Sequence, residues 1–204
     1  MRTVLALALL VLLSVAGIAY GGPNSGASVV IDVEGLTPGD GGVTLKTSVG
    51  PGVDIDIAVY VYDAVNLAAY EIKLTFDPAK LDLNLNYTTP DNGRDEGNFL
   101  NSLGATTPVF IKTVDAEVIT LVNAIQNATA ENSPEGSGLL AVVSFTTRAT
   151  FSEDQGAAFV FQSVELMDAA GVPDMVAPGN LQPGFLNKAE AVEPCRWGQI
   201  KAVF

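Results

Sequence analysis

Residues 55–85 read IDIAVYVYDAVNLAAYEIKLTFDPAKLDLNL and contain two alternating segments, an Asp-Pro turn and a third apolar segment. In the first segment every second residue is apolar, as in a strand with one buried face; these residues are Ile55, Ile57, Val59 and Val61. The second segment repeats this period, and its apolar face consists of Tyr70, Ile72, Leu74 and Phe76. Asp77-Pro78 then ends strand pairing, because proline lacks a backbone donor. The stretch therefore predicts three consecutive strands.

Further strands are predicted along the rest of the chain. Apolar or alternating runs bounded by turn residues occur at 29–33, 43–47, 107–114, 117–122, 138–145 and 159–168. Asp115-Ala116 predicts a tight hairpin, and residues 63–69 a short loop or bulge between the two opening strands. No segment has the long period of about 3.6 that marks a helix. We therefore expect an all-β fold, a two-sheet antiparallel β-sandwich of jelly-roll type with about nine strands.

Composition excludes several classes of function. The net charge is −13, from 10 basic and 23 acidic residues, so phosphate backbones are repelled and we expect no nucleic-acid partner. The sequence has no His, which removes the most common general base and the usual zinc ligands. A glycosidase needs only two carboxylates, but the single Trp197 leaves few aromatic platforms for a sugar. We therefore expect a protein that is not an enzyme.

The N-terminal residues have the pattern of a secretory signal. Met1-Arg2-Thr3 supplies a charged start, and the apolar run 4–18 is followed by small residues suited to cleavage after Ala19 or Gly21. We expect a signal peptide over 1–21, membrane contact only through it, and a mature protein that is secreted, extracellular or on the cell surface. The β-sandwich is then expected over 22–186 and a separate C-terminal tail over 187–204.

The tail combines polar residues with a short apolar and aromatic end. It contains the only cysteine, Cys195, so the chain cannot form an internal disulfide. Its last residues would place apolar side chains on one helical face; these are Trp197, Ile200, Val203 and Phe204. We favour docking of this tail on the sandwich or on a partner over a role in sorting.

Three segments of the chain, taken together, resemble one family. The first is FDPAKLDL at 76–83, the second is GLLAVVSF at 138–145, and the third is the late strand at 159–168. In this order and spacing the chain resembles the cohesin modules of bacterial surface and polysaccharide-degrading assemblies, over roughly residues 28–186. Cohesins share their fold with certain cellulose-binding modules. The resemblance implies a β-sandwich that binds another protein.

The resemblance also implies a partner and a binding face. Cohesins recognise dockerins, small calcium-loaded helical modules, through one exposed sheet face that includes an acidic residue on the strand before the Asp-Pro turn. Aligned on FDP, that residue is Glu71, where the family often has Asp, and Ala69 stands where it often has Asn. The expected partner-binding set is Ala69, Glu71, Lys73 and Thr75 on one strand, with Asn123 and Gln126 near them on a neighbouring strand.

No resident cofactor is predicted, and calcium is expected on the partner rather than on this chain. A weak calcium candidate is the polar segment 86–98, in which Asp91, Asp95 and Glu96 cluster oxygen ligands. Its spacing does not fit an EF-hand loop. An ordinary solvated loop is the favoured interpretation.

Two alternatives from other classes remain open on the sequence. A carbohydrate-binding module on the same fold would bind polysaccharide through outward aromatics, for which Tyr60 and Tyr62 are the evident pair. A structural subunit of an extracellular filament or coat would instead associate with itself, through strand addition or the terminal segment.

Overall fold

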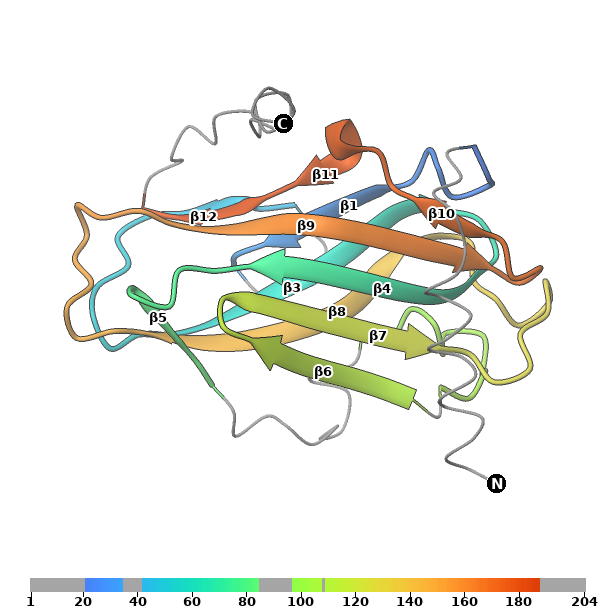
Figure 1. The fold of residues 1–204 in the computed structure, drawn as a ribbon, viewed down its shortest axis with the longest axis horizontal. Coiled ribbons are helices and arrows are strands. Elements are labelled where there is room, and N and C mark those ends of the chain that lie inside the picture. Colours follow the sequence, from blue (N-terminus) through green and yellow to red (C-terminus); the bar gives the residue numbers. More distant parts are fainter. Residues whose placement is uncertain (1–20, 35–41, 85–96, 108, 188–204) are drawn as a thin grey trace, which may run out of the picture.

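The chain folds into two β-sheets that pack face to face (Figure 1). The computed structural model describes residues 21–34, 42–84, 97–107 and 109–187. One sheet contains β1 (Ser28–Asp32), β3 (Asp54–Ala64), β5 (Leu81–Leu83), β8 (Gly136–Thr147) and β11 (Leu181–Gln182). The other contains β2 (Leu45–Lys46), β4 (Leu67–Thr75), β6 (Val109–Asp115), β7 (Val118–Ala124), β9 (Ala157–Asp168), β10 (Pro173–Met175) and β12 (Gly184–Leu186). A short 3-10 turn, Pro178–Asn180, precedes β11.

The strand order confirms the predicted two-sheet sandwich. The five-stranded sheet runs β11-β1-β3-β8-β5, and the seven-stranded sheet runs β2-β12-β9-β4-β7-β6, with β10 paired to β9. All pairings are antiparallel except β1 with β11 and β2 with β12, which are parallel. The described residues thus form twelve strands rather than about nine. The three additional strands, β10, β11 and β12, are short, with two or three residues each, and β2 is the strand predicted at 43–47.

Strands β3 and β4 follow the alternation seen in the sequence. Ile57, Val59 and Val61 of β3 are fully buried, as are Ile72 and Leu74 of β4. The predicted loop at 63–69 was too long, because only residues 65 and 66 lie between the two strands. The turn is this short because Asp63 and Asn66 both adopt positive φ values, 57° and 46°, and Asn and Asp tolerate that conformation better than most residues.

The core between the sheets includes three aromatic rings in a row. Phe145 of β8 lies between Phe76 and Phe159, with ring centroids 5.1 Å and 5.0 Å away and tilted planes. Such tilted contacts are favourable beyond the area that they bury. Tyr70 is also buried, and its hydroxyl donates a hydrogen bond of 2.7 Å to the carbonyl of Leu140 in the opposite sheet. These contacts fix the two sheets against each other.

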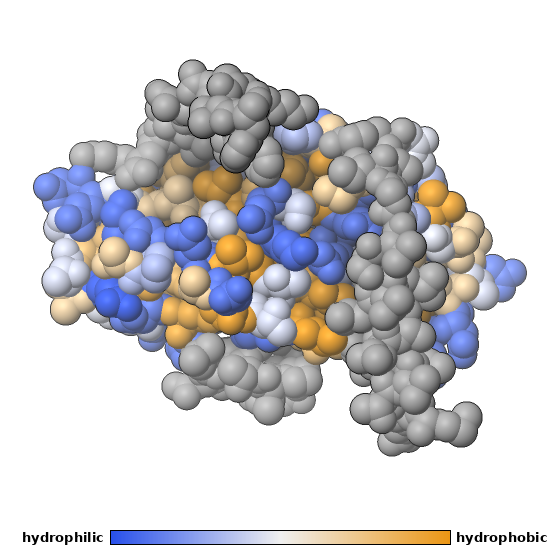
Figure 2. Space-filling model, in the orientation of Figure 1, coloured by the Kyte–Doolittle hydropathy of each residue, from blue (hydrophilic) through white to orange (hydrophobic). Residues whose placement is uncertain are grey.

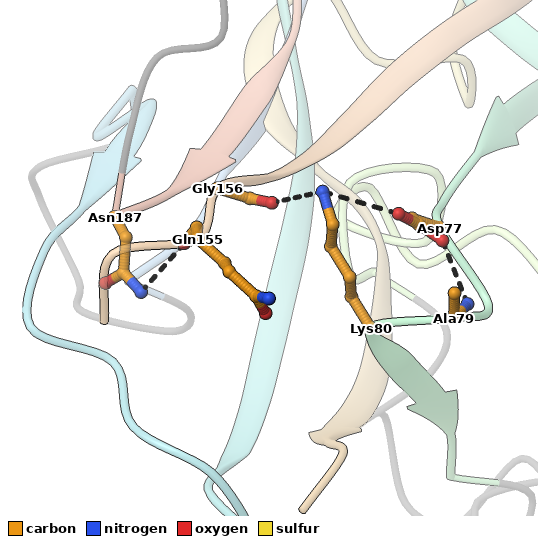
Figure 3. A network of polar contacts seen from close by, with 6 residues as sticks. All are labelled: Asp77, Ala79, Lys80, Gln155, Gly156 and Asn187. Carbon is orange, nitrogen blue, oxygen red and sulfur yellow. Dashed lines mark hydrogen bonds and ion pairs between the residues drawn. The ribbon is translucent and has the colours of Figure 1, made fainter. Parts of the chain in front are cut away.

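The Asp-Pro turn after β4 is held by a network of polar contacts (Figure 3). Asp77 accepts a hydrogen bond of 2.9 Å from the amide of Ala79 and forms an ion pair of 3.4 Å with Lys80. Lys80 also donates 2.6 Å to the carbonyl of Gly156, before β9. The turn is therefore tied to the β8–β9 connection, where Asn187 donates 3.2 Å to the carbonyl of Gln155.

Several sequence predictions fall outside the described residues. They are the signal segment up to residue 20, the calcium candidate with Asp91, Asp95 and Glu96, and the tail from residue 188. Across the four described ranges, no helix is both long and apolar enough to cross a membrane.

Candidate partner-binding face

The outer surface of the seven-stranded sheet carries the predicted partner-binding row. Glu71, Lys73 and Thr75 alternate along β4 with buried apolar residues, so their side chains point away from the core. Residues directly opposite one another on neighbouring strands share a face. The register therefore places Val118, Thr120 and Val122 of β7 on one side of the row, and Val160, Ser163 and Glu165 of β9 on the other. We call these nine residues the outer face.

The polar centre of the outer face has two carboxylates and one ammonium. The Lys73 ammonium contacts the Glu71 carboxylate at 2.8 Å, with side chains that are 40% and 26% exposed. Glu165 lies directly across from Glu71 on β9, and its Oε1 atom is buried without a hydrogen-bond partner. Partial burial and, to a smaller extent, the Glu71 charge raise the pKa of Glu165, while Lys73 lowers it. The pair of carboxylates is therefore incompletely compensated by one cation.

Apolar side chains surround this centre. Val122 is 7% exposed, and Val118 and Val160 are half-buried. On the edge strand β6, Ile111 and Thr113 continue the rows of Val122 and Thr120. Figure 2 shows the same mixture, with orange and blue residues interleaved over this side of the molecule. The outer face thus combines apolar side chains with a small polar centre.

Three of the predicted residues do not occupy the exposed row. Ala69 shares its face but is only 2% exposed, because it is a small residue flanked by Ala124 and Met167 on the neighbouring strands. Asn123 is fully buried and paired with Tyr70, so it points to the opposite side of the sheet. Gln126 is exposed but lies beyond the end of β7. These three placements correct the expected exposure of Ala69 and Asn123 and the expected strand position of Gln126, and partner binding by the predicted set stays a prediction.

Sequence reasoning missed Glu165 and the β7 residues of the outer face. The hairpin at Asp115-Ala116 was predicted, and the structure confirms it, with Asp115 paired to Val118 and Ala116 at a φ of 53°. Because side chains alternate along a strand, the hairpin position places Thr120 and Val122 on one face of β7 and Asn123 on the other. The alternation within β9 would similarly have placed Glu165 opposite β4 once the register was known.

We expect Glu165→Gln to raise the melting temperature at neutral pH by about 1–2 °C, the scale of a partly exposed charge. The folded-state pKa of Glu165 is raised, so its ionised form costs stability, and the cost disappears as the pH falls through that pKa. The gain should therefore vanish below about pH 4, where carboxyls are protonated in both states. Thermal unfolding at both pH values measures this change in melting temperature. The control is Glu153→Gln at an exposed position. A lower melting temperature of Glu165→Gln at neutral pH would contradict the argument.

Tyr60 and Tyr62, the aromatic pair considered for sugar binding, lie on β3 in the other sheet. Both are half-buried. Partial burial raises the pKa of each, and the Asp32 carboxylate raises it further. The Asp32 carboxylate itself accepts hydrogen bonds from the backbone amides of Glu34 and Gly42, at 2.9 Å and 3.0 Å. Within the ranges that the structure describes, no group of three or more acidic or Cys side chains converges as a metal site would require.

Comparison with known proteins finds likeness in structure alone. No protein-family model matches the sequence, and no curated protein matches it. A type II cohesin domain from the cellulosome of Acetivibrio cellulolyticus superposes with a TM-score of 0.55 at 16% identity, covering 79% of this chain and 95% of that one. A non-cellulosomal cohesin from the archaeon Archaeoglobus fulgidus gives 0.52 at 18% identity, with coverages of 81% and 94%. A type I cohesin–dockerin complex from Clostridium thermocellum contains a chain that gives 0.54 at 12% identity, with coverages of 78% and 97%.

These superpositions confirm the predicted class of fold. The chain is a two-sheet β-sandwich with a cohesin-like fold, and it spans nearly the whole length of each of those three cohesin chains. At 12–18% identity the likeness concerns the fold. The chemistry of the outer face must be argued from this chain's own residues.

Proposed function

We propose that this protein is a secreted, non-catalytic interaction module that binds a dockerin-type partner through the outer face, within a cell-surface or polysaccharide-degrading assembly. The single observation that carries the proposal is the outer face itself, in which Glu71, Lys73 and Glu165 lie among buried and half-buried apolar residues on a cohesin-like sandwich. The printed descriptions of similar structures include cohesins in complex with dockerins, which supports this class of partner.

The charges of the outer face favour a partner that supplies a cation. Glu71 shares its carboxylate with Lys73, while Glu165 Oε1 has no hydrogen-bond partner. A Lys or Arg side chain placed beside the partly exposed Glu165 would balance the charge of the second carboxylate. The negative charge of the whole chain, −13, would also speed the approach of a cationic surface.

The test uses charge reversal at the centre of the outer face. The exported protein is titrated against purified type I and type II dockerin modules by calorimetry, with calcium and with a chelator. We expect Glu71→Lys to weaken binding to the recognised module at least about tenfold, since a like charge then meets the partner's cation. Removal of calcium should abolish binding by unfolding the partner.

The matched control is Glu153→Lys, which reverses a charge on the exposed connection between β8 and β9. It should leave the affinity unchanged. An equal loss in both variants would indicate general electrostatics rather than recognition by the outer face. If no dockerin binds, two further measurements separate the alternatives. Retention of the protein on insoluble cellulose would support carbohydrate binding, and light scattering of the protein alone would reveal self-association.

A further inference from the structure

A second polar feature lies away from the outer face, at strand β10. Asp174 is fully buried and is paired in register with Leu166 of β9. Its Oδ2 atom accepts a hydrogen bond of 2.8 Å from the backbone amide of Asn24, but its Oδ1 atom accepts none. None of the ion pairs formed between described residues involves Asp174. A buried carboxylate with an unpaired oxygen lowers the stability of the fold. A hydrogen-bond donor or a cation beside Oδ1 would remove this cost.

The chain segment that leads into β1 lies against this carboxylate. In Figure 1 this dark blue segment lies beside β10, and the Asn24 contact ties the two together. Asn24 is itself fully buried and exchanges hydrogen bonds of 3.1 Å and 2.8 Å with the backbone of Val65. The position of the segment is therefore set by three contacts from one residue.

Gly22 also lies against the Asp174 carboxylate. A Cβ atom built on Gly22 would lie 2.0 Å from Asp174 Oδ1 and 2.6 Å from Oδ2, so no side chain fits there. The α-nitrogen is one bond of about 1.46 Å from the Cα atom, which places it within about 5 Å of the unpaired Oδ1. In an uncut chain this nitrogen is an amide with one hydrogen. In a chain that begins at Gly22 it would be an ammonium with three.

We propose that the chain is cut between Gly21 and Gly22 and that the new α-ammonium of Gly22 pairs with the buried carboxylate of Asp174. A signal peptidase would hydrolyse that bond with one water molecule, leaving a carboxylate on Gly21 and the ammonium on Gly22. Small residues at Ala19 and Gly21 satisfy the pattern such an enzyme needs. The structure favours one of the two cleavage sites that the sequence left open. A cut after Ala19 would place the ammonium on Tyr20, two residues before the glycine that lies against Asp174.

The pairing gives maturation a structural consequence. An opposite charge at this distance stabilises the ionised carboxylate, and removing one partner of a buried pair leaves an uncompensated charge. The mature chain is then more stable than any form that carries residues ahead of Gly22. This inference concerns the lead-in segment and β10, and it holds whether or not the outer face binds a dockerin.

The test starts from the full-length precursor, exported by a bacterial host and purified from outside the inner membrane. Intact mass and N-terminal sequencing should show a chain that begins at Gly22. Asp174→Asn in this chain should lower the melting temperature by about 6–12 °C, because the α-ammonium loses its partner. In a second precursor, Ser-Gln is inserted between Gly21 and Gly22, which keeps the residues before the cut and displaces the ammonium. There Asp174→Asn should leave the melting temperature unchanged or raise it.

Asp168→Asn is the matched control. Asp168 is also buried, but its Oδ1 accepts a hydrogen bond of 2.9 Å from the amide of Val172, so its replacement should act equally in both chains. An exported chain that begins at Tyr20 would overturn the proposal. Equal effects of Asp174→Asn in the native and the extended chain would overturn it as well, since the carboxylate would then act without the terminal ammonium.

Discussion

Replacing Phe145 by alanine is expected to lower the free energy of unfolding by about 3–5 kcal/mol, the range for a large aromatic side chain removed from a packed core. Phe145 is fully buried on the interior strand β8, and its ring contacts both Phe76 and Phe159. The substitution removes the middle ring of the row, so both neighbours lose a partner and a cavity remains between the sheets. The loss is a large fraction of the stability of an ordinary domain, about 5–15 kcal/mol.

Chemical denaturation followed by fluorescence or circular dichroism measures this effect. Phe185→Ala is the matched control, because Phe185 of β12 is half-buried at the rim of the same sandwich and should cost much less. Equal losses from the two substitutions would show that Phe145 is not a central core residue.

Gly97→Ala is expected to destabilise the protein by about 3 kcal/mol, toward the upper end of the cost of overpacking. The amide of Gly97 donates 2.8 Å to the carbonyl of Leu140 on β8. An added Cβ would lie 2.0 Å from the Leu139 carbonyl oxygen and 2.4 Å from the carbonyl carbons of Leu139 and Leu140. These are backbone atoms of the interior strand β8, so they cannot move aside as a flexible side chain would.

The control for this prediction is Gly26→Ala. A Cβ at Gly26 would meet no atom within 4 Å, and its loss of backbone freedom in the unfolded state should make the change neutral or slightly favourable. The difference between the two variants, measured by denaturant titration, isolates the steric contact. An equally small effect at both glycines would mean that the segment at Gly97 detaches from β8 at little cost.

The two-sheet sandwich was predictable because long strands with one buried face leave a clear period of two in the sequence. Strands β3, β4 and β9 each have nine or more residues, and apolar side chains alternate along them. Strands β10 to β12 were missed because two or three residues are too few to show alternation. They form only because the paired neighbour is already in place.

The candidate site was predictable in part. Glu71, Lys73 and Thr75 were correctly placed on one face because they lie within a single strand. Asn123 and Ala69 were misplaced because their exposure depends on neighbours from other strands. Asn123 faces the core side with Tyr70, and its side chain accepts 2.8 Å from the amide of Ala124, so a polar residue is tolerated in a buried position. Glu165 needed the register between β4 and β9, which no local pattern contains.

The two parallel pairings at the ends of the chain have a consequence for how the protein is made. Val29 of β1 pairs with Leu181, and Leu45 of β2 pairs with Phe185. Strands β1 and β2 can therefore form these pairings only after β11 and β12 have been synthesised. Contacts between residues so distant in sequence slow the formation of the native state. We therefore expect the native sandwich to form only after residue 186 has been synthesised.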